Sequence, residues 1–582
     1  MYSKYKDADP KDTIDRIKGI FNEVGIDLVC KTEKHIDGIY SSYLTDSMGH
    51  WQTEGKGTTV QYCEASSYGE AMEHLCIHHA FDISTVSDSA RQYKGFKRYP
   101  DEQVFPVEKI TELPVIMDEL REPYHRLGKN PPSDEEIVEL WKRILKSDVT
   151  SFVPYYCVAQ EKCVFLPDEI LSKLCGSNGS GCGNTPEEAV GHALDEVIER
   201  WCKYKIFSED MTPPEIPDSY LKKRCPDLLK LKQTVETQGG LKILVRDASL
   251  GRGYPVVMIA LIDQTSMRYL VNFGCHPQFE IALERCFTEI FQDRRVVSEL
   301  IERNDMIPWS RFKMDSIHCQ LNWTKLLSDD IGIWPEELFS TRASWDFIEW
   351  QQFNEYSNSI GMKAQLNRLR ADGAEIFIRN VGFFGFPVYK VFIKNISTSH
   401  INFTEDILND LDVHNRIRQF LSKGLSEDDM CSVGRQVFGN DSIVGRLFFY
   451  SLSNEEFALL YAAFLMEYEN TESVYKLLFP WNGRKARMVI RILELAERMG
   501  LTKAIECSRN FASDDVLCFL NVFFSEHPFE NTLSYFHISS ESRQSMSGEK
   551  LRSYRDALMI RIKDYMYDHI PEQGKIRLIL AE

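Results

Sequence analysis

The spacing of apolar residues predicts two helices near the start of the chain. In residues 12–24 the apolar positions recur every three or four residues, and Gly25 follows as a stop. A second helix is expected between residues 55 and 80, after a Gly-Lys-Gly turn. Its apolar stripe is formed by Tyr68, Met72, Leu75 and Cys76.

Apolar runs bounded by turn residues predict strands in the middle of the chain. Three runs, at residues 241–245, 254–262 and 267–273, indicate successive strands. A further strand pair is expected at residues 375–380 and 387–393, on either side of Gly382 and Gly385. Residues 101–168 are rich in proline and acidic residues, with one helix near 135–145 and no catalytic pattern. We interpret them as an elaboration of the core.

After residue 402 the pattern is helical almost throughout. Residues 454–467 and 487–499 carry apolar side chains at three- and four-residue spacing, with few strand signals between them. We therefore expect one domain over residues 1–400 and a helical domain over residues 401–582. Two or three helical hairpins could stack there as a repeat-like unit, although no fixed period identifies a known repeat.

The composition narrows the class of protein. With 582 residues and 43% hydrophobic residues the chain is an ordinary folded protein of more than one domain. A formal net charge of −19 disfavours broad attraction to nucleic acid or to an anionic membrane. The N-terminus has no apolar segment typical of a signal peptide, and residues 381–393 are too short to span a bilayer. We expect a cytoplasmic protein whose 15 cysteines are reduced thiols.

One cluster of His and Cys residues raises the question of zinc. It consists of His74, Cys76, His78 and His79. Its spacing does not match a common structural zinc pattern, so a helix with partly buried His and Cys side chains is the favoured interpretation.

Three expected helices each carry two polar side chains three positions apart, and at that spacing both leave the same helix face. A serine one turn before the first pair adds a hydroxyl, so oxygen ligands of the kind that Mg²⁺ prefers could converge there. The residues are Ser66, Glu70 and Glu73, then Glu196 and Glu199, then Glu289 and Gln292.

From spacing alone, solvated helix faces are the favoured alternative. Glu196 with Arg200, and Arg285 with Glu289, are four residues apart and would also form ordinary ion pairs. Periodicity therefore does not establish a metal site.

The loop at residues 177–185 is more informative. It reads Ser-Asn-Gly-Ser-Gly-Cys-Gly-Asn-Thr immediately before a helix, and small residues with accessible amides at that place can bind an anion. Thr185 or Asn184 could cap the helix, with Glu188 completing a capping box. Neither this loop nor residues 54–58 ends in the Gly-Lys-Ser/Thr of a P-loop, so a Walker-type site is disfavoured.

Taken together, in their order along the chain, these segments resemble the YcaO family. Gly55-Lys56-Gly57 with residues 65–74 (ASSYGEAMEH) is similar to the family's first nucleotide and magnesium helix. Residues 177–185 with residues 196–200 (EVIER) resemble its second. Residues 274–277 (GCHP) with residues 282–294 (ALERCFTEIFQDR) resemble its third. The resemblance covers roughly residues 1–400, including the start at Lys6-Asp7-Ala8.

The resemblance implies an α+β fold and an activity. The fold is a core of β-sheets flanked by helices with an ATP site between them, followed by an all-α C-terminal domain. The activity is ATP- and Mg²⁺-dependent phosphorylation of a peptide amide oxygen after a nucleophile adds to the carbonyl. Magnesium would be held by Glu70, Glu73, Glu196, Glu199 and Glu289. The nucleotide would contact Lys6, Thr13, Arg16, Ser66, Ser177, Asn184, Arg200, Gln292 and Arg294.

Two departures from the family pattern bear on the activity. His74 stands where the family usually places Arg, which concerns one phosphate contact. The chain also ends at residues 577–582 (RLILAE) without the proline-rich terminus of azoline-forming members. No residue identifies the nucleophile, so the catalytic residues are unknown.

Three functions follow from the resemblance. The first is modification of a peptide or protein to an azoline, thioamide or amidine. The second is an accessory role in methylthiolation of a small-subunit ribosomal protein. The third is an inactive nucleotide-binding scaffold. Expected partners are a peptide or protein substrate and a separate precursor-binding or sulfur-transfer protein, with no direct nucleic acid and no membrane; a homodimer is left open.

Overall fold

The chain divides into two units in the computed structural model. The described residues are 5–35, 38–46, 52–77, 98–126, 128–265, 267–290, 307–308, 323, 326–327, 332–398, 454–468, 471–479, 483–509, 511–535 and 548–581. One unit comprises Met1–Asn402 with Ser545–Glu582, and the other Phe403–Gln544. The division differs from the expected one at the C-terminal end, because the last helices belong to the first unit.

The first sheet of the first unit is antiparallel and lies near the N-terminus. It pairs β1 (Leu28–Lys34), β2 (Tyr40–Asp46) and β3 (Gln52–Gly57) in chain order. Helix α2 (Val60–Cys76) packs on β2 and β3, and α1 (Pro10–Glu23) packs on α2. The expected turn at residues 55–57 is instead the end of β3. A Cβ on Gly55 would lie 2.3 Å from the carbonyl oxygen of Cys63 on α2, so close helix–strand packing explains this glycine.

The second sheet has the order β11-β10-β9-β8 and is antiparallel. Its strands are β8 (Lys242–Asp247), β9 (Val256–Asp263), β10 (Arg268–Cys275) and β11 (Ile307–Pro308). The first three agree with the predicted runs. Helices α8 (Asp218–Arg224), α9 (Pro226–Gly239) and α10 (Phe279–Ile290) share one core with this sheet, and its other face joins a second core. Burial on both faces explains why β9 is apolar almost without interruption.

The third sheet has the order β4-β5-β12-β13-β7, and β6 also pairs with β5. The predicted pair is the hairpin β12 (Ile376–Asn380) and β13 (Val388–Ile393), and β7 is Ser180–Cys182. Residues 101–168 contain the helix predicted near 135–145, but they are not a mere elaboration of the core, because β5 (Val149–Cys157) joins β4 (Gln103–Pro106) and β6 (Lys162–Pro167) to β12. Helical segments between these strands are η3 (Val107–Glu112), α4 (Pro114–Arg126), α5 (Asp134–Leu145) and α6 (Asp168–Cys175).

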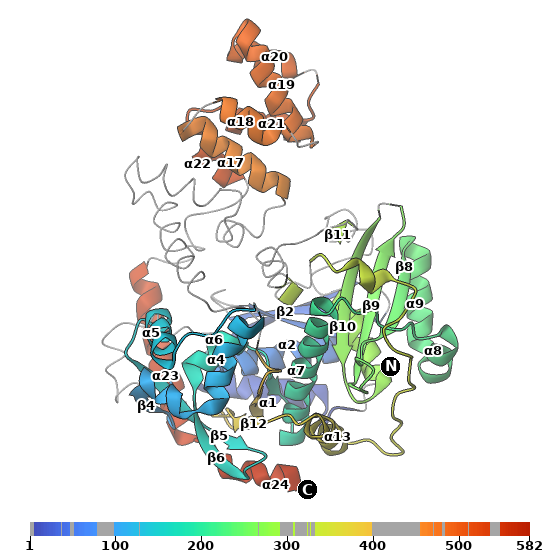
Figure 1. Cartoon of the computed structure of the whole chain (residues 1–582), viewed down its shortest axis with the longest axis vertical. Coiled ribbons are helices and arrows are strands. Elements are labelled where there is room, and N and C mark those ends of the chain that lie inside the picture. The colour runs from blue at the N-terminus through green and yellow to red at the C-terminus, as the bar shows by residue number, and fades with distance from the viewer. Residues whose placement is uncertain are drawn as a thin grey trace. The chain divides into compact units, whose positions relative to one another are not determined.

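Helix α7 (Pro186–Ser208) is central to the first unit. It contacts β7 and β13 of the third sheet and β10 of the second, and α13 (Asn358–Ala371) packs on it (Figure 1). Its buried face, which includes Ala193, Leu194 and Val197, shares one core with both sheets. The mixed α+β fold with sheets flanked by helices is therefore confirmed.

The C-terminal segment of the first unit consists of α23 (Gly548–Asp568), η5 (Gln573–Lys575) and α24 (Ile576–Ala581). It follows the second unit in the chain, and η5 and α24 contact strands of the third sheet. A short helix, η4 (Glu336–Phe339), lies between α10 and α13 in the sequence.

The second unit is helical in its described residues. Its helices are α17 (Asn454–Tyr468), α18 (Thr471–Leu478), α19 (Arg484–Met499), α20 (Leu501–Ser508), α21 (Asp514–Phe523) and α22 (Pro528–Tyr535). They enclose a core of their own that includes Leu460, Phe464, Val489 and Phe519. The helical C-terminal region is confirmed.

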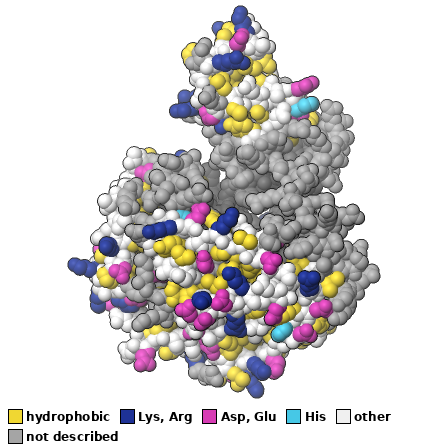
Figure 2. All heavy atoms as spheres, turned by 180° about the vertical axis from the view of Figure 1, so that it is seen from behind, with side chains coloured by type: hydrophobic (Ala, Val, Ile, Leu, Met, Phe, Trp, Pro, Cys, Tyr) yellow, Lys and Arg dark blue, Asp and Glu magenta, His cyan; other side chains and the backbone are white. Residues whose placement is uncertain are grey.

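The surface of the protein carries charges of both signs (Figure 2). On the face shown in Figure 2, acidic and basic side chains are interspersed. None of the described helices combines the length and the apolar character that a bilayer crossing requires.

Candidate functional site

Helix α2 forms one wall of a large cavity in the first unit. Thr59 caps the helix by accepting a hydrogen bond from the Tyr62 amide. One face of α2 is buried in the protein. Ser66, Glu70 and Glu73 lie outside that buried face and line a cavity of about 510 Å³. His74 also lines it, with Nε2 3.8 Å from Glu70 Oε1.

Helices α7 and α10 bring the other acidic residues to the same cavity. Glu196 and Glu199 line it from α7 and Glu289 from α10. Arg200 Nη2 lies 2.8 Å from Glu196 Oε1, as the spacing predicted. The other anticipated ion pair is different, because Glu289 contacts Lys56 of β3 rather than the arginine one turn before it.

Three carboxylates of this cavity, those of Glu70, Glu73 and Glu196, are held in a setting that favours their protonated form. Burial raises the pKa of Glu70 to about 7, and it raises the pKa of Glu73 well above its ordinary value. Repulsion from Glu196 adds to both shifts. Burial also raises the pKa of Glu196, although Arg200 opposes the shift. A bound cation would relieve these costs of ionisation.

The glycine-rich loop borders the cavity, but its glycines have a packing role. Ser177, Asn184 and Gly183 line the cavity. Residues 180–182 form β7, and a Cβ on Gly181 would lie 2.4 Å from the Ala189 carbonyl oxygen of α7. The middle of the loop is therefore a short strand packed between β13 and α7, while residues on either side of it line the cavity.

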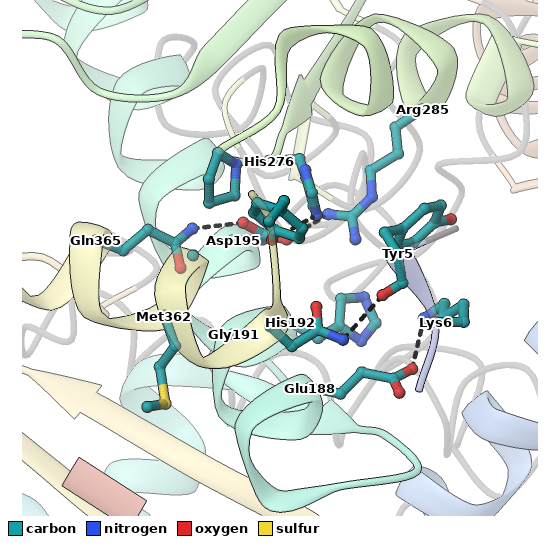
Figure 3. Close-up of a pocket in the computed structure, with 14 residues that line it drawn as sticks. Tyr5, Lys6, Glu188, Gly191, His192, Asp195, His276, Arg285, Met362 and Gln365 are labelled. Carbon is teal, nitrogen blue, oxygen red and sulfur yellow. Dashed lines mark hydrogen bonds and ion pairs between the residues drawn. The ribbon is translucent and has the colours of Figure 1, made fainter. Parts of the chain in front are cut away.

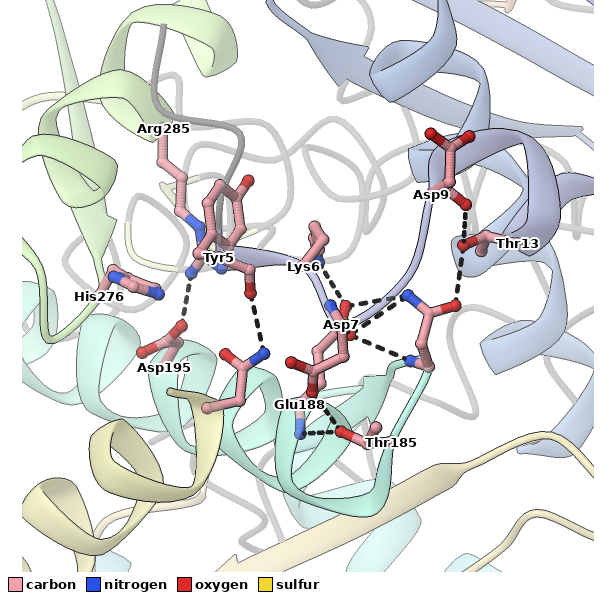
Figure 4. Close-up of polar contacts among 12 residues, drawn as sticks. Tyr5, Lys6, Asp7, Asp9, Thr13, Thr185, Glu188, Asp195, His276 and Arg285 are labelled. Atoms are coloured by element: carbon pink, nitrogen blue, oxygen red, sulfur yellow. Dashed lines mark hydrogen bonds and ion pairs between the residues drawn. The ribbon is translucent and has the colours of Figure 1, made fainter. Parts of the chain in front are cut away.

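The N-terminal strap, residues 5–9, crosses the N-terminal end of α7 (Figure 4). Lys6 Nζ lies 3.0 Å from Glu188 Oε1, and the Asp7 amide donates to Glu188 Oε2 at 3.1 Å. Thr13 Oγ1 donates to Asn184 Oδ1 at 2.8 Å. Burial would raise the pKa of Glu188, but the Lys6 charge and these hydrogen bonds lower it overall.

The Glu188 side chain therefore does not complete the predicted capping box with Thr185. Thr185 Oγ1 accepts from the Glu188 amide at 3.2 Å, as a cap does. The Glu188 carboxylate instead accepts from the Asn184 amide and from the strap. Lys6, Thr13 and Asn184 all line the cavity, so this arrangement fixes three predicted nucleotide contacts at its wall.

A second cavity of about 20 Å³ adjoins the strap (Figure 3). Arg285 Nη1 lies 2.7 Å from Asp195 Oδ2 and donates to the Cys275 carbonyl oxygen at 2.6 Å. Burial, together with the Arg285 charge, lowers the pKa of His192 and of His276 well below the ordinary value, so both rings are neutral. Arg285 of α10 lines both cavities, and its guanidinium contributes a positive charge to each of them.

Among the described residues, one predicted nucleotide contact lies outside the cavity lining. Arg16 does not line the cavity; its guanidinium carbon lies 4.5 Å from the ring centre of Phe386, which does. Gln292 and Arg294 lie outside the described residues, as do His78 and His79 of the His and Cys cluster.

Several residues of the site had not been singled out for a role there. The cavity is also lined by basic and acidic side chains from strands, from α7 and from α10. Lys56 in β3 and the buried Lys203 in α7 are not marked by any periodic pattern, so spacing along the sequence does not indicate a role for them. They are Glu54, Lys56, Glu188, His192, Lys203, Glu284 and Arg285.

The donor set fits Mg²⁺ and the phosphates of a nucleotide. Within the described part of the chain no three His, Cys, Asp or Glu side chains form a ready-made metal cluster. Mg²⁺ commonly takes one or two carboxylates, several waters and substrate phosphates, which the spread of carboxylates here would allow. Ser180, a buried residue at the wall, has a hydroxyl with no hydrogen-bond partner among the described residues, as expected where a polar ligand binds.

Two curated proteins are similar to the chain. An uncharacterized protein of Haemophilus influenzae is 27% identical over 401 residues, which is 67% of this chain and 65% of that protein. The Escherichia coli protein named ribosomal protein S12 methylthiotransferase accessory factor YcaO is 28% identical over 349 residues, 59% of this chain and 58% of that protein. The matches thus span less than two thirds of either relative.

Two solved structures are similar at low identity. A heterocyclase in complex with substrate and cofactor has a TM-score of 0.44 and 16% identity, covering 68% of this chain and 54% of the other. YcaO from Methanopyrus kandleri bound with AMPPCP and Mg²⁺ has a TM-score of 0.41 and 16% identity, covering 67% of this chain and 92% of the other.

The family model described as YcaO cyclodehydratase, ATP- and Mg²⁺-binding, matches residues 54–397, which is more than half of the chain. The match runs from β3 to the end of the third sheet and contains α2, α7 and α10 with their acidic residues. ATP and Mg²⁺ are the cofactors of this family. The chain belongs to the YcaO cyclodehydratase family.

Proposed function

We propose that this chain uses ATP and Mg²⁺ to phosphorylate the oxygen of a backbone amide in a peptide or protein. The observation that carries the proposal is the cavity where carboxylates of three helices meet the basic residues Lys56, Arg200 and Arg285. Glu70, Glu73, Glu196, Glu199 and Glu289 would hold magnesium, which neutralises phosphate charge during phosphoryl transfer. The basic side chains would hold the phosphate oxygens.

The proposed reaction has a balanced sequence of bonds. A nucleophile adds to the amide carbon, and its proton passes to a base. The carbonyl electron pair moves to oxygen, which attacks the γ-phosphorus while the bond from that phosphorus to the β-phosphate oxygen breaks and ADP leaves. The former amide oxygen then departs as phosphate. With a side-chain nucleophile, loss of the amide proton leaves an azoline; sulfide would give a thioamide and an amine an amidine.

The Escherichia coli relative favours a second candidate. Its name places it as an accessory factor of ribosomal protein S12 methylthiotransferase, and this chain matches 58% of its length. A comparable role would make the partner of this chain a methylthiotransferase acting on a ribosomal protein. Under the first proposal, the partner would instead be a separate protein that presents the peptide or supplies sulfur.

Nucleotide binding tests the shared basis of both candidates. ATP should be titrated by calorimetry with and without Mg²⁺ into the wild type, Glu199→Ala and the control Glu355→Ala. Glu355 is exposed and lies outside the cavity lining. We expect Mg²⁺-dependent binding that only Glu199→Ala loses. No nucleotide binding under any metal condition would refute the amide-kinase proposal.

Phosphate release then separates the two candidates. Release that rises with an added peptide and yields ADP would support amide activation. Release that rises only with a radical methylthiotransferase and its ribosomal substrate would support the accessory role.

A further inference from the structure

The turn between β12 and β13 forms part of the cavity wall. Phe386 in this turn is buried and lines the cavity together with Pro10 and Thr13 of α1. The Arg16 guanidinium of α1 lies over the Phe386 ring, and its Nη2 donates to the Gly385 carbonyl oxygen at 2.6 Å. Helix α1 and this turn are thus joined at the cavity.

Helix α23 of the C-terminal segment contacts the same turn through residues that do not line the cavity. The Tyr565 ring stacks on Phe384 with centroids 5.6 Å apart and planes 16° apart. His569, one turn further, stacks on Tyr565 at 4.3 Å. Tyr565 Oη also donates to Glu23 Oε2 of α1 at 2.8 Å. The Tyr565 side chain therefore contacts both the turn, through Phe384, and helix α1, through Glu23.

Gln573 of η5 holds the start of the turn. Its Oε1 accepts from the Asn380 amide and its Nε2 donates to the Asn380 carbonyl oxygen, both at 2.8 Å. This is the pairing that a neighbouring strand would provide. The Asn380 side chain in turn accepts from the Gly382 amide at 2.8 Å, so the order imposed by Gln573 extends into the turn.

We propose that α23 and η5 are positioning elements of the nucleotide cavity, with Tyr565 holding Phe386 and Arg16 in place through Phe384 and Glu23. Tyr565 does not line the cavity, so it acts through these neighbours. Arg16 is exposed on α1, and it contacts Gly385 and Phe386, which both belong to the turn that Tyr565 supports. The segment that follows the second unit would therefore set nucleotide affinity in the first. This inference rests on the proposed function only in taking ATP as the ligand.

The first test measures the wall without a nucleotide. Hydrogen exchange of the peptide covering residues 380–388 should be compared in the wild type, Tyr565→Ala, Tyr565→Phe and the control Tyr567→Ala. Tyr567 is on the same helix two residues further, where the side chain leaves in a different direction. We expect faster exchange in Tyr565→Ala, an intermediate change in Tyr565→Phe, which keeps the ring, and wild-type exchange in Tyr567→Ala.

The second test measures affinity for ATP with Mg²⁺ in the same variants. Tyr565→Ala should weaken binding about threefold to tenfold, the range set by loss of an aromatic pair. Adding Arg16→Ala to Tyr565→Ala should weaken binding less than the product of the two single effects, because both act on one wall. A general loss of stability would not produce that coupling. If Tyr565→Ala does not fold, His569→Ala and Tyr565→Phe carry the test.

The outcomes separate the two proposals. Unchanged exchange in Tyr565→Ala, or independent effects of Tyr565 and Arg16 on ATP affinity, would overturn the positioning role. A wild type that binds no ATP would refute the proposed function, and the exchange comparison would then decide the positioning role alone.

Discussion

Replacing Glu70 by glutamine should stabilise the ligand-free protein at pH 8 and weaken its binding of ATP with Mg²⁺. Burial raises the pKa of Glu70 from 4.5 to about 7 against the opposing charge of Lys56. The folded state therefore binds this proton more tightly than the unfolded chain. Its contribution to stability is complete below pH 4.5 and is lost as the pH rises through about 7.

The size of the effect follows from the shift and the exposure of the side chain. A pKa moved from 4.5 to about 7 corresponds to about 3 kcal/mol of lost folding free energy at pH 8. The Glu70 side chain is 38% exposed, so solvent screening reduces this to about 1 kcal/mol. Glutamine keeps the oxygen that accepts from the Glu54 amide. The variant should gain about 1 kcal/mol at pH 8 and about a quarter of that at pH 5.

Urea unfolding at pH 8 and pH 5 measures the gain. Tryptophan fluorescence reports mainly on the first unit, because every tryptophan except Trp481 precedes residue 400. The matched control is Glu355→Gln, whose side chain is exposed, and it should show the same stability as the wild type at both pH values. If Glu70→Gln lowers stability at pH 8, or changes it equally at both pH values, the ionised carboxylate is not destabilising and the reasoning fails.

The remaining predictions concern the cation, one departure from the family pattern and one buried ion pair. MgCl₂ without nucleotide should raise the unfolding temperature more at pH 8 than at pH 6, because a bound cation requires ionised carboxylates; equal shifts, relative to NaCl of matched ionic strength, would contradict this. His74 Nε2 lies 3.8 Å from the Glu70 carboxylate at the cavity wall, so the permanent positive charge of His74→Arg should make ATP binding up to about fivefold tighter in calorimetry. Asp195→Asn leaves the Arg285 charge without its carboxylate and should cost about 3 kcal/mol in urea unfolding. Wild-type stability of Asp195→Asn would show that solvent already screens Arg285.

Some elements of the fold could be predicted because the burial of their side chains leaves a local pattern in the sequence, either a continuous apolar run or a helical period. Strands β8, β9 and β10 are short apolar runs separated by polar turns, and α1 and α19 have apolar positions at helical spacing. Spacing predicts that Glu70, Glu196 and Glu289 lie on helices, whereas a shared site for them is implied only by the family resemblance; all three line one cavity.

Other elements depend on tertiary contacts that no local pattern reports. Strand β5 contains Pro154 and is bounded by acidic segments, yet it pairs with three other strands. Lys6 is predicted as a nucleotide contact only through the family resemblance, and no local pattern places it beside Glu188, for which the sequence predicts only a helix cap. The tail was expected to be a separate domain, whereas Gln573 shows that its last part pairs with the hairpin of the third sheet.

Two neighbouring residues of α7 show why spacing alone could not identify the site. Asp195 is buried, and its carboxylate is satisfied within the protein by Arg285, Gln365 and Cys275. Glu196, the next residue, faces the cavity and is opposed there by the carboxylate of Glu73. Asp195 thus has its partners inside the protein, whereas Glu196 pairs with Arg200 but also lies close to a second carboxylate at the cavity. That difference depends on what the fold brings to each side of the helix, and it supports the proposal that magnesium is held at Glu196 rather than at Asp195.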